Sequence, residues 1–330
     1  MKSLTRRMIR RSKYPTPPTS PASSQSTTPP TPTPAAPAKC PVILNASNLA
    51  ALLNKNPYTN RGDAFLAAWK SSDKKSYYDA HNRNGVETIE HRRREIQKAS
   101  PFITANIRAP KPQFMDVMSS GKVPAIFDTH TDRAEFHTES SFSNTEVMKE
   151  AKRLAFTRYG TEREICIIER VRDILPEYDF HHREDEIVRR EIGTTTEGFP
   201  IVLQGKVDGM SADGKTILEC KTRMHKLFMK LREYEALQTT AYLELFPEAT
   251  QAVLTEAYFG SNESPDINII FIPRGGQDWK TVALGVGEAL AWILSREHLQ
   301  DALVKSKNKT ILVQHLVTRA LDAKGPPPPE

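Results

Sequence analysis

The chain has 330 residues, of which 38% are hydrophobic and 26% charged, a composition that supports one sizeable folded core. No apolar run reaches the roughly 18 residues that a membrane-spanning helix needs, so the sequence predicts no membrane partner. The formal net charge is +6, but residues 1–62 hold nine of the 46 Lys and Arg residues and no acid, which leaves 37 basic against 40 acidic residues, or −3, in the remainder. Attraction to a polyanion must therefore come from local basic patches, such as His91–Arg94 and Lys221–Arg232.

Both ends of the chain differ in composition from its middle. Prolines are concentrated in residues 15–41 and again in 326–329. Segments so rich in proline do not bury enough apolar surface to fold, so we predict disordered tails at 1–41 and 321–330. A single domain at 42–320 lies between them.

The first 13 residues carry several arginines and lysines and no acid, and they lead into a segment rich in Ser, Thr and Pro. Such a start resembles a mitochondrial targeting sequence. A nuclear localisation signal fits the same basic cluster, and so does a tail that touches DNA without sequence preference. We therefore predict a mitochondrial location, with the nucleus as an alternative.

The first part of the domain shows the spacing of helices. Residues 45–69 begin with a capping asparagine and carry leucines at helical intervals, which predicts two helices separated by a turn at Asn56-Pro57. Residues 70–98 are polar and predict a solvated helix with connections. From 144 to 175 the chain lacks proline and apolar residues recur at helical spacing, which predicts one long helix with Gly160 as a point of interruption.

The second part of the domain alternates strands with helices. Alternating apolar residues and turn signals predict five strands, at 186–192, 199–210, 216–221, 252–259 and 267–272. Helices are predicted at 232–245 and 279–303. This order is typical of the α/β class, with a central mixed β-sheet flanked by helices.

An Asp-Gly pair at 213–214 predicts a two-residue hairpin turn between two of these strands. With both residues in the central turn positions, the pairing places Asp208 directly opposite Glu219, with their Cβ atoms about 4.5 to 5.5 Å apart. Two carboxylates at that distance repel each other unless a cation lies between them. Carboxylate oxygens are ligands that Mg²⁺ prefers, so the hairpin predicts a magnesium site.

The alternation of a strand also places Lys221 on the same face as Glu219, while Leu218 and Cys220 point into an apolar layer. The backbone carbonyl of Cys220 is then available as a further oxygen ligand. Lys221 can orient or deprotonate an attacking water and offset the charge that develops on a phosphate.

An acid two residues before a lysine is common by itself, and the same spacing occurs at Asp73–Lys75, Asp278–Lys280 and Asp322–Lys324. Only Glu219–Lys221 ends an apolar strand and faces an aspartate across a predicted hairpin. The alternative is a surface hairpin with an ordinary cluster of charges.

Two further elements extend the candidate site. Gln238 and Tyr242 lie four residues apart on one helix, so they share a face that can meet the site or the DNA backbone, the alternative being the edge of an amphipathic helix. Glu164 follows Gly160 by four residues and is a candidate third carboxylate, the alternative being a solvent-facing glutamate.

These residues, in this order, resemble the PD-(D/E)XK nuclease superfamily, and in particular the YqaJ-like viral recombinase group that includes lambda exonuclease. The resemblance extends from residue 42 to 245. It is carried by Asn45–Ser47, Asn56–Tyr58, Gly160–Glu164, Asp208, Glu219–Lys221, and Gln238 with Tyr242.

The resemblance implies a restriction-endonuclease-like core and dependence on Mg²⁺, with Mn²⁺ as a substitute. It implies the following roles: Asp208, Glu219, Glu164 and the Cys220 carbonyl bind metal, Lys221 acts on the water, and Gln238 helps to hold the catalytic site. Four residues are implied to contact DNA, with the terminal phosphate at the first of them: Ser47, Arg223, Lys226 and Tyr242.

The function so indicated is a metal-dependent DNA exonuclease that cuts from duplex ends, 5' to 3', in recombination, repair or genome maintenance. The alternatives are a single-strand or flap nuclease of the mitochondrial RecB-like type and a catalytically inactive DNA-binding scaffold. The implied partners are DNA, further copies of the chain in a ring, and a recombination or single-strand-binding protein. The basic N-terminal extension differs from the phage enzymes, which adds the host cell of a large virus to the expected locations.

Overall fold

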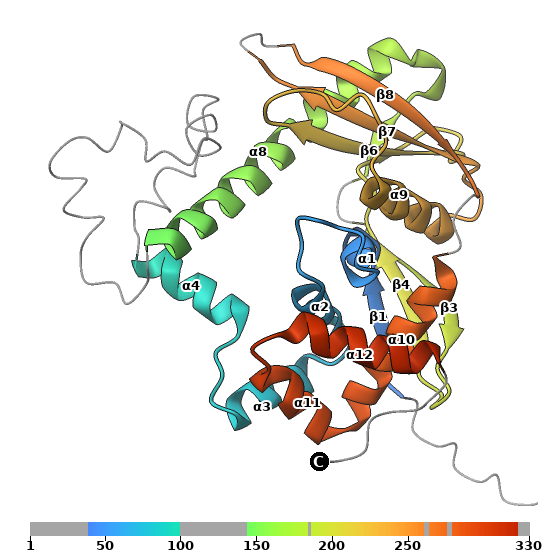
Figure 1. Cartoon of the computed structure of the whole chain (residues 1–330). Helices are drawn as coiled ribbons and strands as arrows, with labels where there is room; N and C mark the ends of the chain where they lie inside the picture. The colour runs from blue at the N-terminus through green and yellow to red at the C-terminus, as the bar shows by residue number, and fades with distance from the viewer. Residues whose placement is uncertain (1–38, 100–143, 184–185, 261–263, 276–278, 323–330) are drawn as a thin grey trace, which may run out of the picture. The chain divides into compact units, whose positions relative to one another are not determined.

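Two mixed β-sheets organise the residues that the computed structural model describes, which are 39–99, 144–183, 186–260, 264–275 and 279–322 (Figure 1). Helices flank both sheets, so the predicted α/β class with mixed sheets is confirmed. The tails on which the predictions of disorder and location rest lie largely outside the described residues. No helix among the described residues is both long and apolar enough to cross a membrane.

The larger sheet has five strands. In the order of their pairing they are β2 (His181–His182), β5 (Gly209–Met210), β6 (Thr216–Arg223), β7 (Gln251–Tyr258) and β8 (Asp266–Pro273). β6 and β7 are parallel and the other neighbours are antiparallel. A parallel pair needs a crossover connection, which α9 (Glu233–Leu245) supplies between β6 and β7.

The smaller sheet has three strands, in the order β1 (Val42–Asn45), β4 (Pro200–Gly205) and β3 (Val188–Thr194). β3 and β4 form a hairpin, as predicted, closed by the N–H of Thr195 donating to the carbonyl of Phe199 at 2.9 Å. β1 was not predicted, because three apolar residues and an asparagine directly before a helix show no period of their own.

The predicted strand at 199–210 is wrong in one respect, because the chain changes sheets within it. β4 ends at Gly205 and β5 begins at Gly209, so the two halves belong to different sheets. A β-carbon on Gly205 would lie 2.8 Å from Cε1 of Tyr242 and 2.9 Å from Cδ1 of Leu245. Glycine therefore allows α9 to pack closely where the chain leaves the first sheet.

The N-terminal helices are α1 (Ala46–Leu52), α2 (Arg61–Ser72), α3 (Lys74–Arg83) and α4 (Ile89–Ala99). The side chain of Asn60 caps α2 and that of Asp73 caps α3, each by accepting backbone N–H groups of the first turn. The segment predicted as one solvated helix is therefore two helices, and α3 buries Tyr77 against the core.

The C-terminal part forms two helices where one was predicted at 279–303, and a third, unpredicted helix follows them. These are α10 (Lys280–Ser295), α11 (Glu297–Lys305) and α12 (Lys309–Leu321). The break falls at Arg296, whose backbone is extended and whose guanidinium pairs with Glu197 at 2.5 Å. This contact is remote in sequence, so helical spacing alone could not show it.

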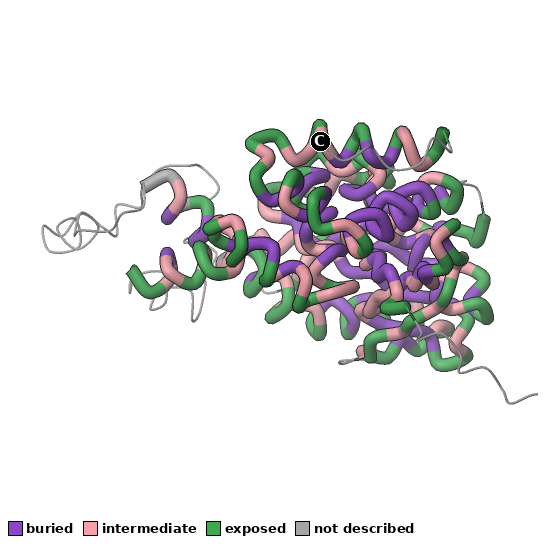
Figure 2. Tube along the Cα trace, turned by 90° about the horizontal axis from the view of Figure 1, so that it is seen from below, coloured by how far each residue is buried: buried purple, intermediate pink, exposed green. Residues whose placement is uncertain are grey.

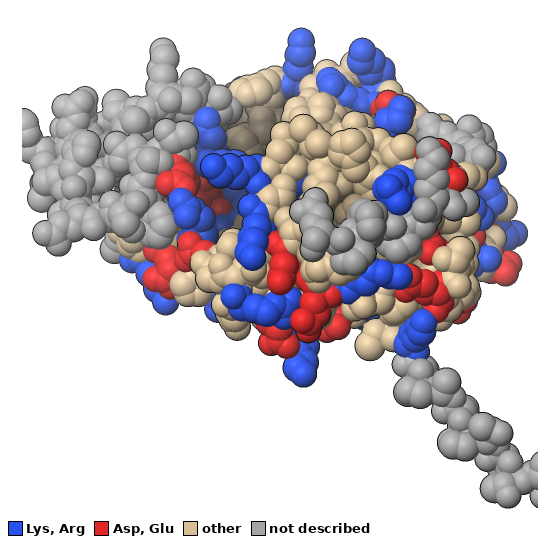
Figure 3. All heavy atoms as spheres, turned by 60° about the horizontal axis from the view of Figure 1, so that its bottom comes forward, with Lys and Arg blue, Asp and Glu red and all other residues tan. Residues whose placement is uncertain are grey.

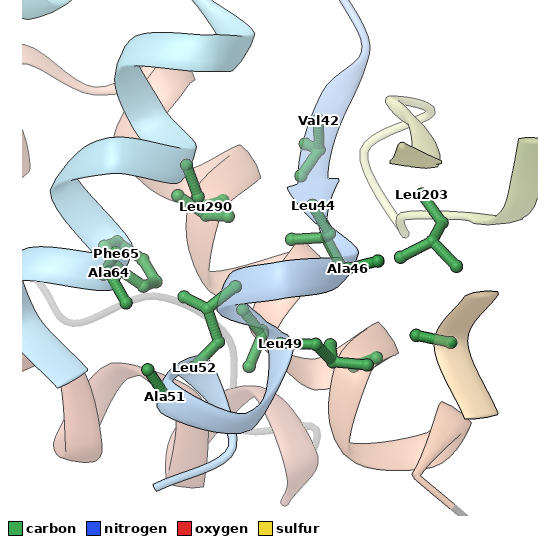
Figure 4. Packing of buried hydrophobic residues seen from close by; sticks show 14 of the residues in the cluster. Val42, Leu44, Ala46, Leu49, Ala51, Leu52, Ala64, Phe65, Leu203 and Leu290 are labelled. Carbon is green, nitrogen blue, oxygen red and sulfur yellow. The ribbon is translucent and has the colours of Figure 1, made fainter. Parts of the chain in front are cut away.

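The long helix α8 (Asn144–Ile174) continues through Gly160 without interruption. α8 packs on one face of the five-stranded sheet, and α9 lies between the opposite face of that sheet and the smaller sheet with α1 (Figure 1). Figure 2 shows the buried stretches gathered in the interior and the exposed stretches around them. The largest apolar cluster of the described residues joins β1, α1, α2 and α10. Its members include Leu44, Leu49, Phe65 and Leu290 (Figure 4).

Replacing Gly205 tests the close packing of α9. We expect Gly205→Ala to lower the free energy of unfolding by about 1 to 3 kcal/mol, because the added methyl group overlaps two buried side chains. The measurement is chemical denaturation followed by circular dichroism. Gly160→Ala in α8 is the matched control, since no atom lies within 4 Å of the added carbon and the change should be neutral or stabilise by up to about 1 kcal/mol. Equal losses in both variants would contradict this packing.

Candidate active site

The β5–β6 hairpin has the predicted register. Gly209 pairs with Leu218 and Met210 with Ile217, and the same register continued by one residue places Asp208 opposite Glu219. This pairing is the one expected from the Asp-Gly signal, and the strands also confirm the predicted faces. The side chains of Leu218 and Cys220 lie in an apolar cluster with α8.

The turn itself differs by one residue from the prediction. The N–H of Gly214 donates to the carbonyl of Ser211 at 2.9 Å, so the central residues are Ala212 and Asp213, and Gly214 follows with a φ of +71°. The Asp213 carboxylate accepts from the Ser211 hydroxyl at 2.6 Å and from the Lys215 N–H at 3.0 Å. The register is unaffected, because the four-residue loop shares its centre with the predicted two-residue turn.

Asp208 lies just before β5 and binds the backbone of the opposite strand. Its Oδ2 accepts the N–H of Cys220 at 2.7 Å. Within a strand, the N–H and C=O of one residue point to the same side, so the Cys220 carbonyl also faces the Asp208 side and away from β7. The predicted carboxylate and carbonyl are therefore brought together.

Glu219, Lys221 and Gln238 form a hydrogen-bonded network. Oε1 of Glu219 accepts from Nζ of Lys221 at 2.6 Å and from Nε2 of Gln238 at 2.8 Å. Oε1 of Gln238 accepts from Lys221 at 3.1 Å, and its Nε2 also donates to the hydroxyl of Tyr242 at 3.0 Å. The predicted contact between this face of α9 and the catalytic strand is present.

Glu219 is 3% exposed, and its second oxygen, Oε2, is buried and has no hydrogen-bond partner among the residues that the structure describes. Burial and the charge of Asp208 raise the pKa of Glu219 to about 8, although Lys221 acts in the opposite direction. Burial likewise raises the pKa of Asp208, against the Cys220 N–H bond and nearby positive charges. Buried acids with raised pKa values and a free oxygen fit a divalent cation, which would favour both ionised carboxylates.

Glu164 projects from α8 toward the same site. Burial, followed by the charge of Asp208, raises the pKa of Glu164. This electrostatic coupling places the predicted third carboxylate near the other two. Within the described ranges, however, no group of three or more His, Cys, Asp and Glu side chains has the geometry to hold a metal ion. Glu164 is therefore a neighbour of the Asp208–Glu219 pair in this conformation.

One residue near the carboxylates, His182, was missed from the sequence, whereas Lys206 stands two residues before Asp208 in the same predicted strand. His182 and Lys206 both act electrostatically to lower the pKa of Asp208 and of Glu164, so both side chains lie beside the site. His182 reaches it because β2 pairs with β5, opposite Gly209. A two-residue strand shows no period, so only its position before the predicted strands could have drawn attention to it.

The implied DNA contacts have different outcomes. Ser47 and Lys226 are exposed, as a DNA contact requires. Tyr242 is only 4% exposed and supports Gln238, so the prediction that it contacts DNA is not met in this conformation. Arg223 is 8% exposed, and its guanidinium lies 2.6 Å from both Glu235 and Glu256, so we correct its implied role from DNA contact to buried ion pair.

A cavity of 570 Å³ opens beside Lys221. Its lining includes Glu164, Cys220 and Lys221 and many residues of the predicted basic patch at Lys221–Arg232. The other predicted basic patch, His91–Arg94 on α4, attracts a polyanion less strongly, because its arginines pair with acids, as in Arg92–Glu146 and Arg93–Glu150. Figure 3 likewise shows basic and acidic side chains next to each other on the face that it draws.

No family model and no curated protein matches the chain. Solved structures similar to it include SSO0001, at 12% identity and a TM-score of 0.31, over 65% of this chain and 95% of that one. An alkaline exonuclease from Laribacter hongkongensis is similar at 12% identity and a TM-score of 0.27, over 68% of this chain and 93% of the other. A candidate exonuclease from Eubacterium rectale is similar at 15% identity and a TM-score of 0.27, over 68% of this chain and 85% of the other. Because these TM-scores are low, we base the function on this chain's own residues.

The raised pKa of Glu219 predicts a pH dependence of stability in metal-free protein. Between its ordinary value of 4.5 and about 8, the unfolded chain releases this proton while the folded chain retains it, so stability falls as pH rises through that range. Urea midpoints in EDTA should therefore fall between about pH 5 and about pH 8, and this fall should be smaller in Glu219→Gln. Glu233→Gln, on the exposed side of α9, is the control and should keep the wild-type trend. The same trend in Glu219→Gln as in wild type would contradict the assignment.

Proposed function

We propose that this chain is a metal-dependent nuclease that hydrolyses phosphodiester bonds in DNA. The observation that supports it is the Asp208–Glu219 pair, in which two buried acids with raised pKa values lie beside Lys221 and one carboxylate oxygen has no partner. A structural hairpin gains nothing from such an arrangement, because the buried charges oppose folding. A site that receives a cation and a phosphate accounts for it.

Asp208, Glu219 and the Cys220 carbonyl would hold Mg²⁺, for which Mn²⁺ would substitute, and Glu164 would contribute from α8. When bound, the ion would polarise a phosphate oxygen and lower the pKa of a water. Hard oxygen donors of this kind suit Mg²⁺, which binds through one or two carboxylates and keeps several waters. The donor set of this chain thus fits the ion.

Lys221 positions the reacting groups. Its ammonium has three N–H donors, of which one binds Glu219 and one binds Gln238, so a third remains for a phosphate or a water in the adjoining cavity. Burial lowers the pKa of Lys221, but the charge and the hydrogen bond of Glu219 raise it by more. The pKa of Lys221 is therefore raised, and the protonated ammonium is favoured. In this conformation Lys221 is therefore suited to orient water and stabilise negative charge rather than to remove a proton.

Gln238 and Tyr242 keep Lys221 and Glu219 in place. Gln238 bonds to both residues, and the Tyr242 hydroxyl accepts its other N–H. Tyr242 is fixed in turn by its packing against Gly205. Each catalytic side chain therefore has a second residue that orients it, as phosphoryl chemistry requires.

We extend the proposal to an exonuclease that acts 5' to 3' from DNA ends in recombination or repair, on the resemblance to the YqaJ-like group. On the same resemblance, we propose that copies of the chain assemble into a ring. We propose a mitochondrial location from the basic N-terminal segment. An inactive scaffold is disfavoured, because Asp208, Glu219 and Lys221 are all present and are brought together.

Digestion of end-labelled DNA tests the proposed chemistry. We expect Lys221→Ala and Asp208→Asn to slow Mg²⁺-dependent digestion by about 100-fold or more, since each removes preorganised charge from the reacting phosphate. EDTA should stop the wild type. Lys215→Ala is the matched control, because Lys215 is an exposed lysine in the loop of the same hairpin, and it should digest DNA at the wild-type rate. Wild-type digestion by Lys221→Ala, or digestion that persists in EDTA, would refute the assignment.

A further inference from the structure

The cavity beside Lys221 is lined by five aromatic rings that come from three separate parts of the chain. Tyr58 lies in the connection between α1 and α2, Phe156 and Tyr159 lie on α8, and Phe228 and Tyr234 lie at and before the start of α9. These segments are remote in sequence. Their convergence next to the candidate catalytic lysine is therefore a property of the tertiary structure.

Three of the five rings have partners within the protein. Tyr159 is 3% exposed, with the guanidinium of Arg163 3.6 Å from its ring centre. Phe228 lies between two guanidinium groups, those of Arg223 at 4.3 Å and Arg232 at 3.6 Å. Tyr234 packs edge to face with Tyr58, at 5.7 Å between ring centres. These contacts build the wall of the cavity.

Tyr58 and Phe156 remain open. Tyr58 is 69% exposed in spite of its edge contact with Tyr234, and Phe156 is 38% exposed. Exposed aromatic rings at the mouth of a concave site are typical of surfaces that bind another molecule. They provide flat faces on which planar groups stack.

The charge of the lining identifies the chemistry of the occupant. Glu164 is the single acid among the lining residues, against Lys221, Lys226 and the deeply paired Arg223. Lys226 and its neighbour His225 are exposed. Since Arg223 is paired with two glutamates and Lys221 with Glu219, the exposed Lys226 is the lysine of the lining best placed to meet the phosphates of a nucleic acid strand.

The size of the cavity favours unpaired nucleotides over a duplex. A volume of 570 Å³ is that of a site for a small ligand, and a double helix is too wide to enter it. Every base has a flat face, so stacking on Tyr58 and Phe156 would hold a single strand without selecting its sequence.

We infer that this cavity binds the unpaired bases of a single-stranded DNA end, with Tyr58 and Phe156 as stacking residues and Lys226 on the phosphates. The inference rests on the proposed nuclease function for the role of the adjoining site. It adds two residues, Tyr58 and Phe156, that would favour single-stranded over double-stranded DNA and that lie outside the group of Asp208, Glu219 and Lys221.

Binding without metal tests the inference separately from catalysis. The probe is a fluorescein-labelled oligothymidylate of about ten nucleotides in EDTA, where cleavage does not interfere. Tyr58→Ala and Phe156→Ala should each weaken binding by about tenfold, and the double variant by more. Tyr58→Phe keeps the ring and should bind like the wild type. An oligonucleotide of the same length with abasic positions should bind the wild type as weakly as thymidylate binds the double variant.

Phe271→Ala is the matched control, because Phe271 is a 47% exposed aromatic residue of β8 outside the cavity lining. It should leave the affinity unchanged. Unchanged binding by the double variant, or equal affinity for abasic and normal strands, would overturn the inference while leaving the nuclease proposal intact. Loss of binding in Tyr58→Phe as well as in Tyr58→Ala would also overturn it, since the stacking face is retained. Failure of the wild type to cut DNA would instead refute the proposed function.

Discussion

The register of the β5–β6 hairpin places two acids together at a point where neither is well solvated, and the rest of the site responds to that constraint. Asp208 binds the backbone N–H of Cys220, and Glu219 binds Lys221 and Gln238. Even with these bonds, burial raises the pKa of both acids, and the charge of Asp208 raises the pKa of Glu219 further. The metal-free protein thus stores an unfavourable electrostatic energy that a bound cation would relieve.

The two helices that pack on the five-stranded sheet contribute different residues to the site. α9 crosses over between the parallel strands β6 and β7, and it carries Gln238 and Tyr242 to the Glu219 face. α8 covers the opposite face and brings Glu164 and Phe156 to the edge of the cavity. The group of Glu219, Lys221 and Gln238 in the candidate site therefore depends on α9, whereas the proposed strand-binding wall depends on α8 and on the connection that carries Tyr58.

A buried ion network lies at the end of β6, beside the cavity that Arg223 helps to line. The guanidinium of Arg223 contacts Glu235 and Glu256, and Glu256 also accepts the N–H of Met229 at 2.9 Å. Arg223 further stacks on Phe228. Because these charges are buried, loss of one partner would leave the others uncompensated and would release the segment before α9. The arginine thus acts on the shape of the cavity rather than on DNA directly.

Local patterns in the sequence predicted the hairpin of the candidate site and the faces on which its residues lie. The Asp-Gly signal gave the hairpin register, strand alternation separated Leu218 and Cys220 from Glu219, and helical spacing put Gln238 with Tyr242. Only the tertiary structure decided that the strand predicted at 199–210 changes sheets.

The tertiary structure also decided that Tyr242 and Arg223 are buried and that Tyr58 and Phe156 line the same cavity. The physical reason is that a sequence pattern describes only its own helix or strand. Periodicity reports which side of its own element a residue occupies, whereas burial and pairing depend on elements that are far away in sequence. For the same reason the sequence shows no link between His182 and Asp208, which depends on the pairing of β2 with β5.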